Sequence, residues 1–503
     1  MDLAHLSSLA ANNDWLALWP ELALGCLALL LLVLEIFLRR SAGRLIPAVA
    51  ISGQLGILAG VLIDWHNPAL GHVLFGGLIR LSVSSQIMRV FFLLASTLVF
   101  FLARVVLKRS SMPTVEFHHI VLVVTGAMML LGETEHLAML FVALETVTIG
   151  LYILVSYNRT NALTLEAGLK YLVMGALSSG LLLFGIALLY GAGGDPALIG
   201  HSANPMRYPE LAVFLKANPH NFLAEVGVLL VLAGVAFKIG AFPFQIWIPD
   251  VYQGAPTPVT AFLAVSSKAA GFAVLLGLVR HAFFPYQWLT LPVLAFMAVA
   301  TLLFGNLAAL SQYNVKRLIG LSGVSHAGFL LLGVLAVTKT PFALGGVYFY
   351  LFAYLFANFA VFFVMAHLAG PNDPEQEIEH YSGLAKEEPF LAGVLTVGLG
   401  SLAGIPPLAG FMGKFIVFVA AYQAGAYIPL AAAVIAVVIS VYYYFSWIGA
   451  MYFQVWRPNT ELTPRPERTP VDFWSRITAL GLALASVVLG FGPWSLGHWL
   501  LPR

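Results

Sequence analysis

The sequence predicts an all-α polytopic membrane protein with about fourteen transmembrane helices, including two inverted five-helix repeats that each contain a broken helix. Of the 503 residues, 60% are hydrophobic and only 10% are charged, whereas about a quarter of an average soluble domain is charged. The apolar residues gather in segments of about 20 residues, the length of a helix that crosses a bilayer. Two of these segments, far apart in the chain, are interrupted by Gly and Pro and carry a lysine.

Fourteen apolar segments have spanning length. In chain order they cover residues 16–38, 45–63, 84–107, 116–133, 137–157, 166–190, 222–244, 257–281, 287–310, 318–337, 342–369, 389–424, 425–455 and 472–500. The longest connection, residues 191–220, contains Gly, Pro and Asn without a strong hydrophobic period, so we expect an ordered loop there.

The basic residues orient this bundle. With the N-terminus outside, fourteen of the 25 Lys and Arg fall on the inner side, six on the outer side and five within the spans. An excess of basic residues marks the cytoplasmic side, so both termini are expected in the periplasm. Two of the five within spans, Arg89 and Lys170, lie near span ends, where a long side chain can reach the membrane surface.

The other three lysines lie deep in apolar segments: Lys238, Lys268 and Lys414. A charged side chain at the bilayer centre costs about 2.5–3.5 kcal/mol on insertion scales, so such residues are functional candidates. The acid at comparable depth is Glu145, in the fifth span. Burial favours the neutral form of a carboxylate or a lysine, and pairing favours the charged form. Glu145 and a buried lysine can therefore exchange protons, or they can form a static ion pair.

Both interrupted segments break at glycine and proline. The seventh segment breaks at Gly240 and Pro243, and the twelfth at Gly404, Pro406 and Pro407. A break frees backbone groups, which a membrane tolerates only where protein or trapped water satisfies them. Lys238 lies just before the first break, and Lys414 follows the second.

The two broken segments lie five helices apart, which suggests duplicated five-helix units. An odd number of helices per unit inverts the second copy relative to the first. We expect repeats at residues 116–281 and 287–455, flanked by a three-helix segment at 1–115 and a final helix at 471–503. His326 then falls roughly where Glu145 falls in the first unit. It is a candidate proton relay, or a hydrogen-bonding residue between helices.

Four strings carry a resemblance to a known family: EAGLKYLVMGALSSG, AFPFQIWIPDVYQGAPTPVTAFLAVSSKAAGF, NLAALSQYNVKRLIGLSGVSHAGF and GIPPLAGFMGKF. Together they resemble the antiporter-like membrane subunits of respiratory complex I, the NADH–quinone oxidoreductase, over most of residues 116–455. Among the three large subunits of this kind, Lys414 argues against the M type and the short C-terminal region against the L type. The length and the SHAG string are similar to the N type.

The resemblance implies proton translocation through two linked half-channels. It implies that Glu145 and Lys238 form the first half-channel's pair, that Lys268 connects the halves, and that Lys414 serves the second. Lys170 matches the family's EA-x-x-KY motif. The resemblance also implies a bacterial inner-membrane location and other membrane subunits of complex I as partners. FMN, iron–sulfur clusters, NADH and quinone belong to those partners.

The residues themselves give no sign of a cofactor, metal or nucleic acid bound to this chain. Cys26 is the single cysteine, and the net charge is +2. The aromatic stretch from Phe349 to Phe363 is interpreted as lipid-facing or packing surface, not as a quinone site. Two further functions stay open. One is the D-type subunit of a multisubunit Na⁺/H⁺ antiporter, and the other is a passive scaffold subunit whose charges only hold helices together.

Overall fold

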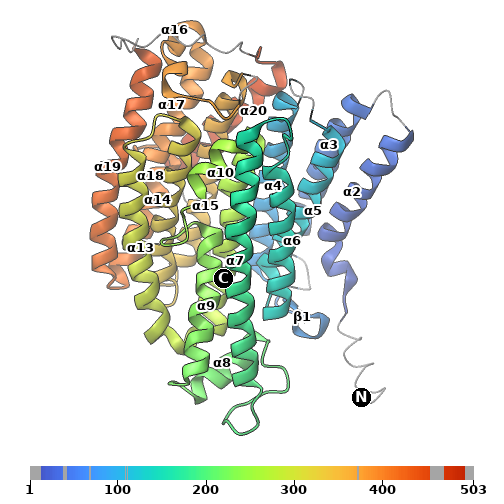
Figure 1. Cartoon of the computed structure of the whole chain (residues 1–503), viewed down its shortest axis with the longest axis vertical. Helices are drawn as coiled ribbons and strands as arrows, with labels where there is room; N and C mark the ends of the chain where they lie inside the picture. Colours follow the sequence, from blue (N-terminus) through green and yellow to red (C-terminus); the bar gives the residue numbers. More distant parts are fainter. Residues whose placement is uncertain are drawn as a thin grey trace.

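The structure, a computed structural model, describes residues 13–37, 42–66, 70–107, 109, 112–370, 373–453 and 469–492. Several basic residues that orient the expected topology lie outside the described residues, namely Arg39, Arg40, Lys108, Arg457, Arg465, Arg468 and Arg503. Most helices run along the long axis of the molecule, side by side (Figure 1).

Within the described residues, 13 helices are long and apolar enough to cross a membrane. The first six are α2 (Trp19–Phe37, preceded by η1, Trp15–Leu18), α3 (Ala42–Ile63), α4 (Val83–Val106), α5 (Thr114–Glu133), α6 (Leu137–Val155) and α7 (Ala162–Gly193). Then follow α9 (Phe222–Ile239), a run of α11 (Thr257–Phe262), η4 (Leu263–Ser267), α12 (Lys268–Gly277) and η5 (Leu278–Ala282), and η6 (Phe284–Tyr286) with α13 (Gln287–Ala309). The last four are α14 (Val315–Ala336), α15 (Ala343–Leu368), α19 (Tyr427–Tyr452) and α20 (Phe473–Phe491).

The twelfth predicted segment is not one helix but two shorter apolar helices, α17 (Pro389–Ala403) and α18 (Ala409–Gln423). With this broken pair, the described residues contain the fourteen membrane segments that the sequence predicts. The all-α polytopic fold is therefore confirmed.

Both predicted helix breaks are present, and they share a backbone pattern. Helix α9 ends at Gly240, with φ 71°, and α17 ends at Gly404, with φ 87°. A left-handed backbone suits glycine because a Cβ would clash there. Three residues after each glycine comes a proline with a cis peptide bond, Pro243 or Pro407. The seventh segment was predicted to run to residue 244, but its helix ends at Ile239, before the break.

The connection at residues 191–220 holds a helix that the sequence did not predict, α8 (Tyr208–Ala217). A small hairpin of β1 (Val73–Leu74) and β2 (Ile79–Arg80) was also missed. Helix α8 and the hairpin lie at one end of the bundle, here the hairpin face, and α16 (Leu384–Glu387) lies at the other end, here the α16 face (Figure 1). The short elements η2 (Asp64–His66), η3 (Phe75–Gly77), α10 (Ile248–Gly254) and η7 (Ile378–Tyr381) complete the described fold.

The centre of the bundle is formed by α14, α15 and the run from Thr257 to Ala282. In an apolar stretch of 18 residues, 100% of the residues are buried in α14 and 94% in α15. The share is 89% in the run from Thr257 to Ala282. The corresponding share is 33% in α7, whose exposed leucines and valines face outward. Lys268 and His326 lie on the central helices, so the fold itself keeps them away from the bilayer.

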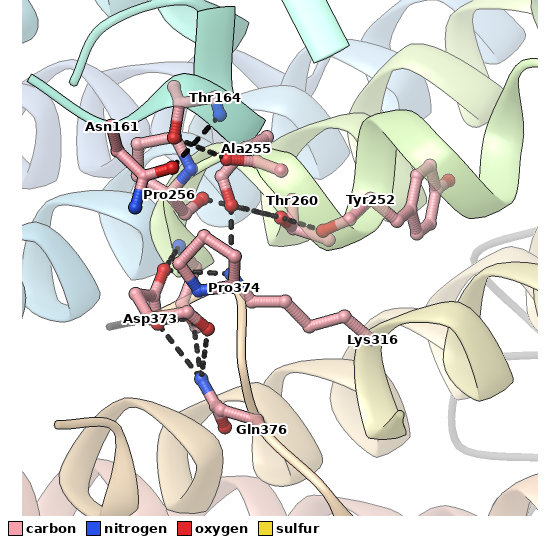
Figure 2. Close-up of polar contacts among 12 residues, drawn as sticks. Asn161, Thr164, Tyr252, Ala255, Pro256, Thr260, Lys316, Asp373, Pro374 and Gln376 are labelled. Atoms are coloured by element: carbon pink, nitrogen blue, oxygen red, sulfur yellow. Dashed lines mark hydrogen bonds and ion pairs between the residues drawn. The ribbon is translucent and has the colours of Figure 1, made fainter. Parts of the chain in front are cut away.

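Around Asp373, a cluster of polar contacts ties the two halves of the chain together near the start of α11 and α14 (Figure 2). Buried Lys316, in the first turn of α14, lies 2.7 Å from the Asp373 carboxylate and donates to the Ala255 carbonyl at 2.8 Å. The backbone N–H and the hydroxyl of Thr257 donate to the same carboxylate at 2.7 and 2.6 Å. Gln376 donates to it at 2.8 Å. We call these five residues the Asp373 cluster.

Candidate functional site

Lys238 lies in the last turn of α9, directly before the first helix break. The residue is 6% exposed, and its Nζ has no hydrogen-bond partner in the described part of the chain. The partial negative charge at a helix C-terminus favours a cation there. The break therefore offers this buried amine some stabilisation, and none of the described side chains or carbonyls adds a hydrogen bond to it.

Glu145, on α6, is the acidic side chain within electrostatic reach of Lys238. It is half-buried and accepts a hydrogen bond of 2.5 Å from the Ser179 hydroxyl on α7. The two charged groups therefore act on each other through space and not through a direct hydrogen bond. The structure thus places these two predicted residues within electrostatic reach of each other, and the sequence gives no indication of Ser179.

Lys268 begins α12, immediately after the π-helical turn η4. Single π-turns inside membrane helices frequently occur at functional sites. The residue is 2% exposed, and its Nζ donates to the Gly323 carbonyl of α14 and, at 3.4 Å, to the Tyr354 hydroxyl of α15. The Nζ also lies 5.2 Å from the centre of the Tyr354 ring. All three central helices therefore meet at this amine.

Gly323 makes room for that contact. A Cβ at this position would lie 2.9 Å from Lys268 Nζ and 3.0 Å from the Tyr354 hydroxyl. Such distances are shorter than ordinary side-chain packing allows. A side chain at position 323 would therefore push the amine away from its carbonyl partner.

His326 lies one turn further along α14 and is 2% exposed. Its Nδ1 is 2.8 Å from the Tyr350 hydroxyl, and its Nε2 is 3.2 Å from the Tyr444 hydroxyl. Lys268 and Lys414 are the cations within electrostatic reach of the ring. Because a hydroxyl can donate or accept, His326 can hold a proton on either nitrogen while keeping both contacts. It is a hydrogen-bonding residue that also links the two lysines electrostatically.

Lys414, on α18, satisfies the backbone at the second break. Its Nζ donates to the carbonyls of Leu402 and Ala403 at 2.9 and 3.0 Å, and it lies 4.7 Å from the centre of the Phe329 ring. These carbonyls belong to the last turn of α17, where the break removes their helical partners. The ammonium thus replaces the missing backbone donors.

Lys170 is separate from this buried set. Its side chain is 44% exposed and forms ion pairs with Glu166 at 2.7 Å and with Asp250 at 2.6 Å. Asp250 also accepts from Arg317 at 2.5 Å. Burial raises the pKa of Asp250, but the hydrogen bonds from Lys170 and Arg317 outweigh burial and hold that pKa below its usual value.

Sequence reasoning misread one residue, Arg89, and left one aromatic stretch open between two interpretations. Arg89 does not reach the membrane surface; it is 1% exposed and bound by carboxylates. The aromatic stretch from Phe349 to Phe363 is buried packing apart from a half-buried Phe356, and it supplies Tyr350 and Tyr354 to the site. The tyrosines could have been noticed, since their hydroxyls recur at a spacing of one helical turn in an otherwise apolar segment.

Among the described residues, no group of three or more His, Cys, Asp or Glu side chains could hold a metal ion. The titratable groups gathered at the centre are instead lysine amines, one imidazole and tyrosine hydroxyls. Such groups bind and release protons.

Comparison with known proteins gives one family. Residues 134–440 match the family model described as "NADH:quinone oxidoreductase/Mrp antiporter, TM". The chain is 62% identical, over its whole length and that of the relative, to NADH-quinone oxidoreductase subunit N 1 of Opitutus terrae. It is similar to a chain of respiratory complex I from Thermus thermophilus, with 31% identity, a TM-score of 0.78 and coverage of 95% of this chain and 98% of that one. A chain of the Mrp complex from Dietzia sp. DQ12-45-1b shares the fold at 22% identity, with a TM-score of 0.81 and coverage of 96% of both chains.

Proposed function

The chain belongs to the family of NADH:quinone oxidoreductase and Mrp antiporter membrane subunits, and from this premise we propose how its buried charges carry protons. It is an N-type antiporter-like subunit of an NADH–quinone oxidoreductase, and it serves proton translocation in that complex. The proposal concerns the residues that carry the protons and the way in which they are coupled.

In this proposal, protons move along Glu145, Lys238, Lys268, His326 and Lys414. One observation carries it: His326 lies within electrostatic reach of both Lys268 and Lys414, and tyrosine hydroxyls contact both of its nitrogens. At an effective dielectric of about 20, two charges about 7 Å apart interact by roughly 2.4 kcal/mol. A proton that arrives at one group therefore changes the occupancy of the next.

The two helix breaks divide this path into halves. Lys238 and Glu145 belong to the first repeat, residues 116–281, and Lys414 and His326 to the second, residues 287–455. Lys268, in the first repeat, donates to Gly323, in the second. It is therefore the group that connects the two half-channels. Residues 1–115 and 471–503 flank the repeats. Lys170 contributes two ion pairs at the surface and no step in the path.

The energy for this movement comes from electron transfer in partner subunits. We assign FMN, the iron–sulfur clusters, NADH and quinone to those subunits and no redox step to this chain. The chain acts in the bacterial inner membrane with both termini on the periplasmic side. The hairpin face is then the outer face and the α16 face the cytoplasmic one.

A Na⁺/H⁺ antiporter subunit of D type remains the second candidate. The Mrp complex of Dietzia has the same fold, but the identity is 22%, against 62% for the subunit N relative. The two functions differ in ion dependence. Proton uptake driven by NADH oxidation identifies the first, and uptake that needs an opposing Na⁺ gradient identifies the second.

A static scaffold is the remaining alternative, and Lys238→Ala tests it. The assembled complex, in liposomes, is supplied with NADH and a soluble quinone analogue, and proton uptake and NADH oxidation are recorded together. Without Lys238, Glu145 loses the charge that cycles beside it, so the coupled proton uptake falls by about tenfold, equivalent to about 1.4 kcal/mol in a barrier. The matched control is Lys386→Ala, at an exposed position on α16. If Lys238→Ala retains the wild-type uptake and rate, the buried lysines only hold helices together.

A further inference from the structure

The residues outside the proposed proton path include a second buried ionic group, near the hairpin face. Arg89 of α4 lies between two carboxylates. Its Nε is 2.8 Å from Glu21 Oε1 and 2.6 Å from Glu133 Oε1, and one of its terminal nitrogens is 2.9 Å from Glu21 Oε2. Glu21 is on α2, and Glu133 is the last residue of α5. We call these three side chains the Arg89 triad.

The triad is fully enclosed, yet its formal charges do not balance. The side chains of Arg89, Glu21 and Glu133 are 1%, 7% and 0% exposed. One guanidinium faces two carboxylates, which leaves a net negative charge in a buried site. Isolated buried charges are expensive, and proteins neutralise them by pairing or by binding a proton.

The geometry shows where such a proton fits. Glu21 Oε1 and Glu133 Oε1 lie 2.8 and 2.6 Å from the same Arg89 nitrogen, so the two carboxyls are close neighbours. Glu133 Oε2 has no hydrogen-bond donor among the described residues, and Oε1 has only its ion-pair contact with Arg89. As two carboxylates, these groups only repel each other. One added proton turns the contact into a hydrogen bond and balances the charge of the triad.

The triad also borders a cavity. Glu133 lines a space of about 250 Å³ between the outer parts of α4 and α5 and the end of the central run, together with Ser82, Tyr208, Arg280 and Tyr348. Its lining also includes the exposed residues Val83 and His281, so the cavity reaches the surface. This volume is large enough for several water molecules, and its polar lining offers them partners. Because the Glu133 side chain is 0% exposed, the cavity ends beside the triad and gives a short route to the hairpin face that opens when this side chain moves.

We propose that Glu21 and Glu133 share one exchangeable proton beside Arg89 and form a proton-binding site that opens to the hairpin face through this cavity. The site belongs to helices α2, α4 and α5, and it contains none of the residues of the proposed proton path. On release, the shared proton passes to water in the cavity, and Arg89 then stabilises both carboxylates.

The groups around the triad fit this assignment. On α4, the Gln86 amide oxygen is 3.4 Å from Arg89, and the Ala17 carbonyl of η1 accepts from it at 2.9 Å. Next to Glu133, Glu135 lies 3.1 Å from Arg80, so its charge is already compensated. Across the cavity, Arg280 and His281 of η5 are basic. Within the described parts of the chain, the surroundings thus supply no further unpaired acid to share the proton.

The test uses infrared spectroscopy of the whole complex in liposomes, because a protonated carboxyl has a C=O band separate from that of a carboxylate. In the wild type, one carboxyl band should titrate with the outside pH and shift in D₂O. Glu133→Gln and Glu21→Gln should each remove this same band, and the double variant should remove nothing more. The matched control is Glu225→Gln, which replaces a half-buried carboxyl in the first turn of α9.

Three outcomes would overturn the proposal. In the first, Glu133→Gln has the wild-type band, so both carboxylates are permanently ionised around Arg89. In the second, the two single variants remove two different bands, so the proton is not shared. In the third, the band does not shift in D₂O, so the site is closed.

If the glutamine variants do not assemble, Glu133→Asp replaces them. This variant keeps a carboxyl and should shift the band, and a band that stays in place would contradict the site. These readouts do not depend on Lys238 or on pumping, so their failure leaves the proposed function standing.

Discussion

The three buried lysines of the centre have different surroundings. Lys268 and Lys414 donate to backbone carbonyls, and both lie near an aromatic ring. The Lys238 amine has no such partner in the described residues and has Glu145 within electrostatic reach. Its charge therefore depends most on a neighbour that itself can gain or lose a proton. In the proposed proton path, we therefore expect Lys238 to load a proton and the other two lysines to hold one.

The variant Lys268→Arg tests whether position 268 needs only a positive charge or also the ability to release a proton. A guanidinium keeps the positive charge but hardly deprotonates, and it is larger than the space between Gly323 and Tyr354. We expect the complex to assemble and its coupled proton uptake to fall by about tenfold or more, measured beside NADH oxidation. Lys170→Arg is the control, because that side chain is 44% exposed and bound to carboxylates, which arginine also binds. Normal uptake in Lys268→Arg would show that position 268 needs a charge but no proton transfer.

Residue by residue, the sequence could predict the buried charges but not their partners. A single lysine in an apolar segment stands out, so Lys238, Lys268 and Lys414 could be selected. Their contacts come from other helices: the partners of Lys268 are 55 and 86 residues away in the chain. Arg89 was misread for the same reason, since Glu21 lies 68 residues before it. A hydrophobicity pattern carries no information about such contacts.

The two broken helices are the elements that a sequence reveals most clearly. Glycine and proline inside an apolar segment predict a break, and both breaks occur where they were expected. Helix α8 was missed because 10 residues with a proline near the start carry too weak a period. The run from Thr257 to Ala282 was predicted as a plain helix, and its π-helical turns could not be anticipated.

At the second break, Gly404→Ala tests the space that glycine provides. The added Cβ would lie 3.0 Å from Lys414 Cδ and 3.2 Å from its Nζ, and φ is 87°. The left-handed backbone alone costs roughly 1–2 kcal/mol. Displacing Lys414 adds the loss of its two carbonyl contacts. We expect a larger fall in proton uptake than in the amount of assembled complex.

The control for this variant is Gly425→Ala, since Gly425 has φ 78° but nothing within 4 Å of the added Cβ. It shares the backbone strain and lacks the contact with Lys414. Assembly and proton uptake of the two variants are compared in the same membranes. Equal effects on uptake would mean that the strain, and not the position of Lys414, explains the result.

Across the whole molecule, the Asp373 cluster holds the two halves of the chain together at its end of the bundle. Asp373→Asn leaves the fully buried Lys316 amine without its anion, and breaking a buried pair from one side costs about 3–5 kcal/mol. We expect thermal denaturation of the purified complex at a fixed scan rate to begin several degrees lower. Adding Lys316→Met to Asp373→Asn should recover part of the lost thermal stability, because no buried charge is then left unpaired.

The control is Arg104→Gln, which removes the exposed pair of Arg104 and Asp472, with side chains 32% and 44% exposed. Exposed pairs contribute about 0–1 kcal/mol, so this variant should denature close to the wild type. If Asp373→Asn behaves like Arg104→Gln, the cluster does not stabilise the contact between the halves.

The membrane orientation can be tested on the whole molecule because Cys26 is the single cysteine. In a Cys26→Ser background, Asp195→Cys introduces a thiol in the exposed connection between α7 and α8, and Lys386→Cys introduces one on α16. We expect a membrane-impermeant maleimide to label position 195 in intact cells and position 386 only after the cells are opened. The reverse pattern would contradict a periplasmic hairpin face.

The Asp373 cluster also has a consequence for how the protein is made. Asp373 follows Lys316 by 57 residues and Thr257 by 116. At about 5–20 residues per second, a ribosome needs roughly 6 to 23 seconds to reach Asp373 after Thr257. During that time, the start of α11 lacks the carboxylate that accepts from its first N–H, and Lys316 enters the membrane without a counter-ion. The contacts at the start of α11, in the first half of the bundle, are thus completed only when Asp373, in the second half, has been synthesised. A nascent chain that stops before Asp373 keeps an unpaired cation, a mark by which unfinished copies differ from complete ones.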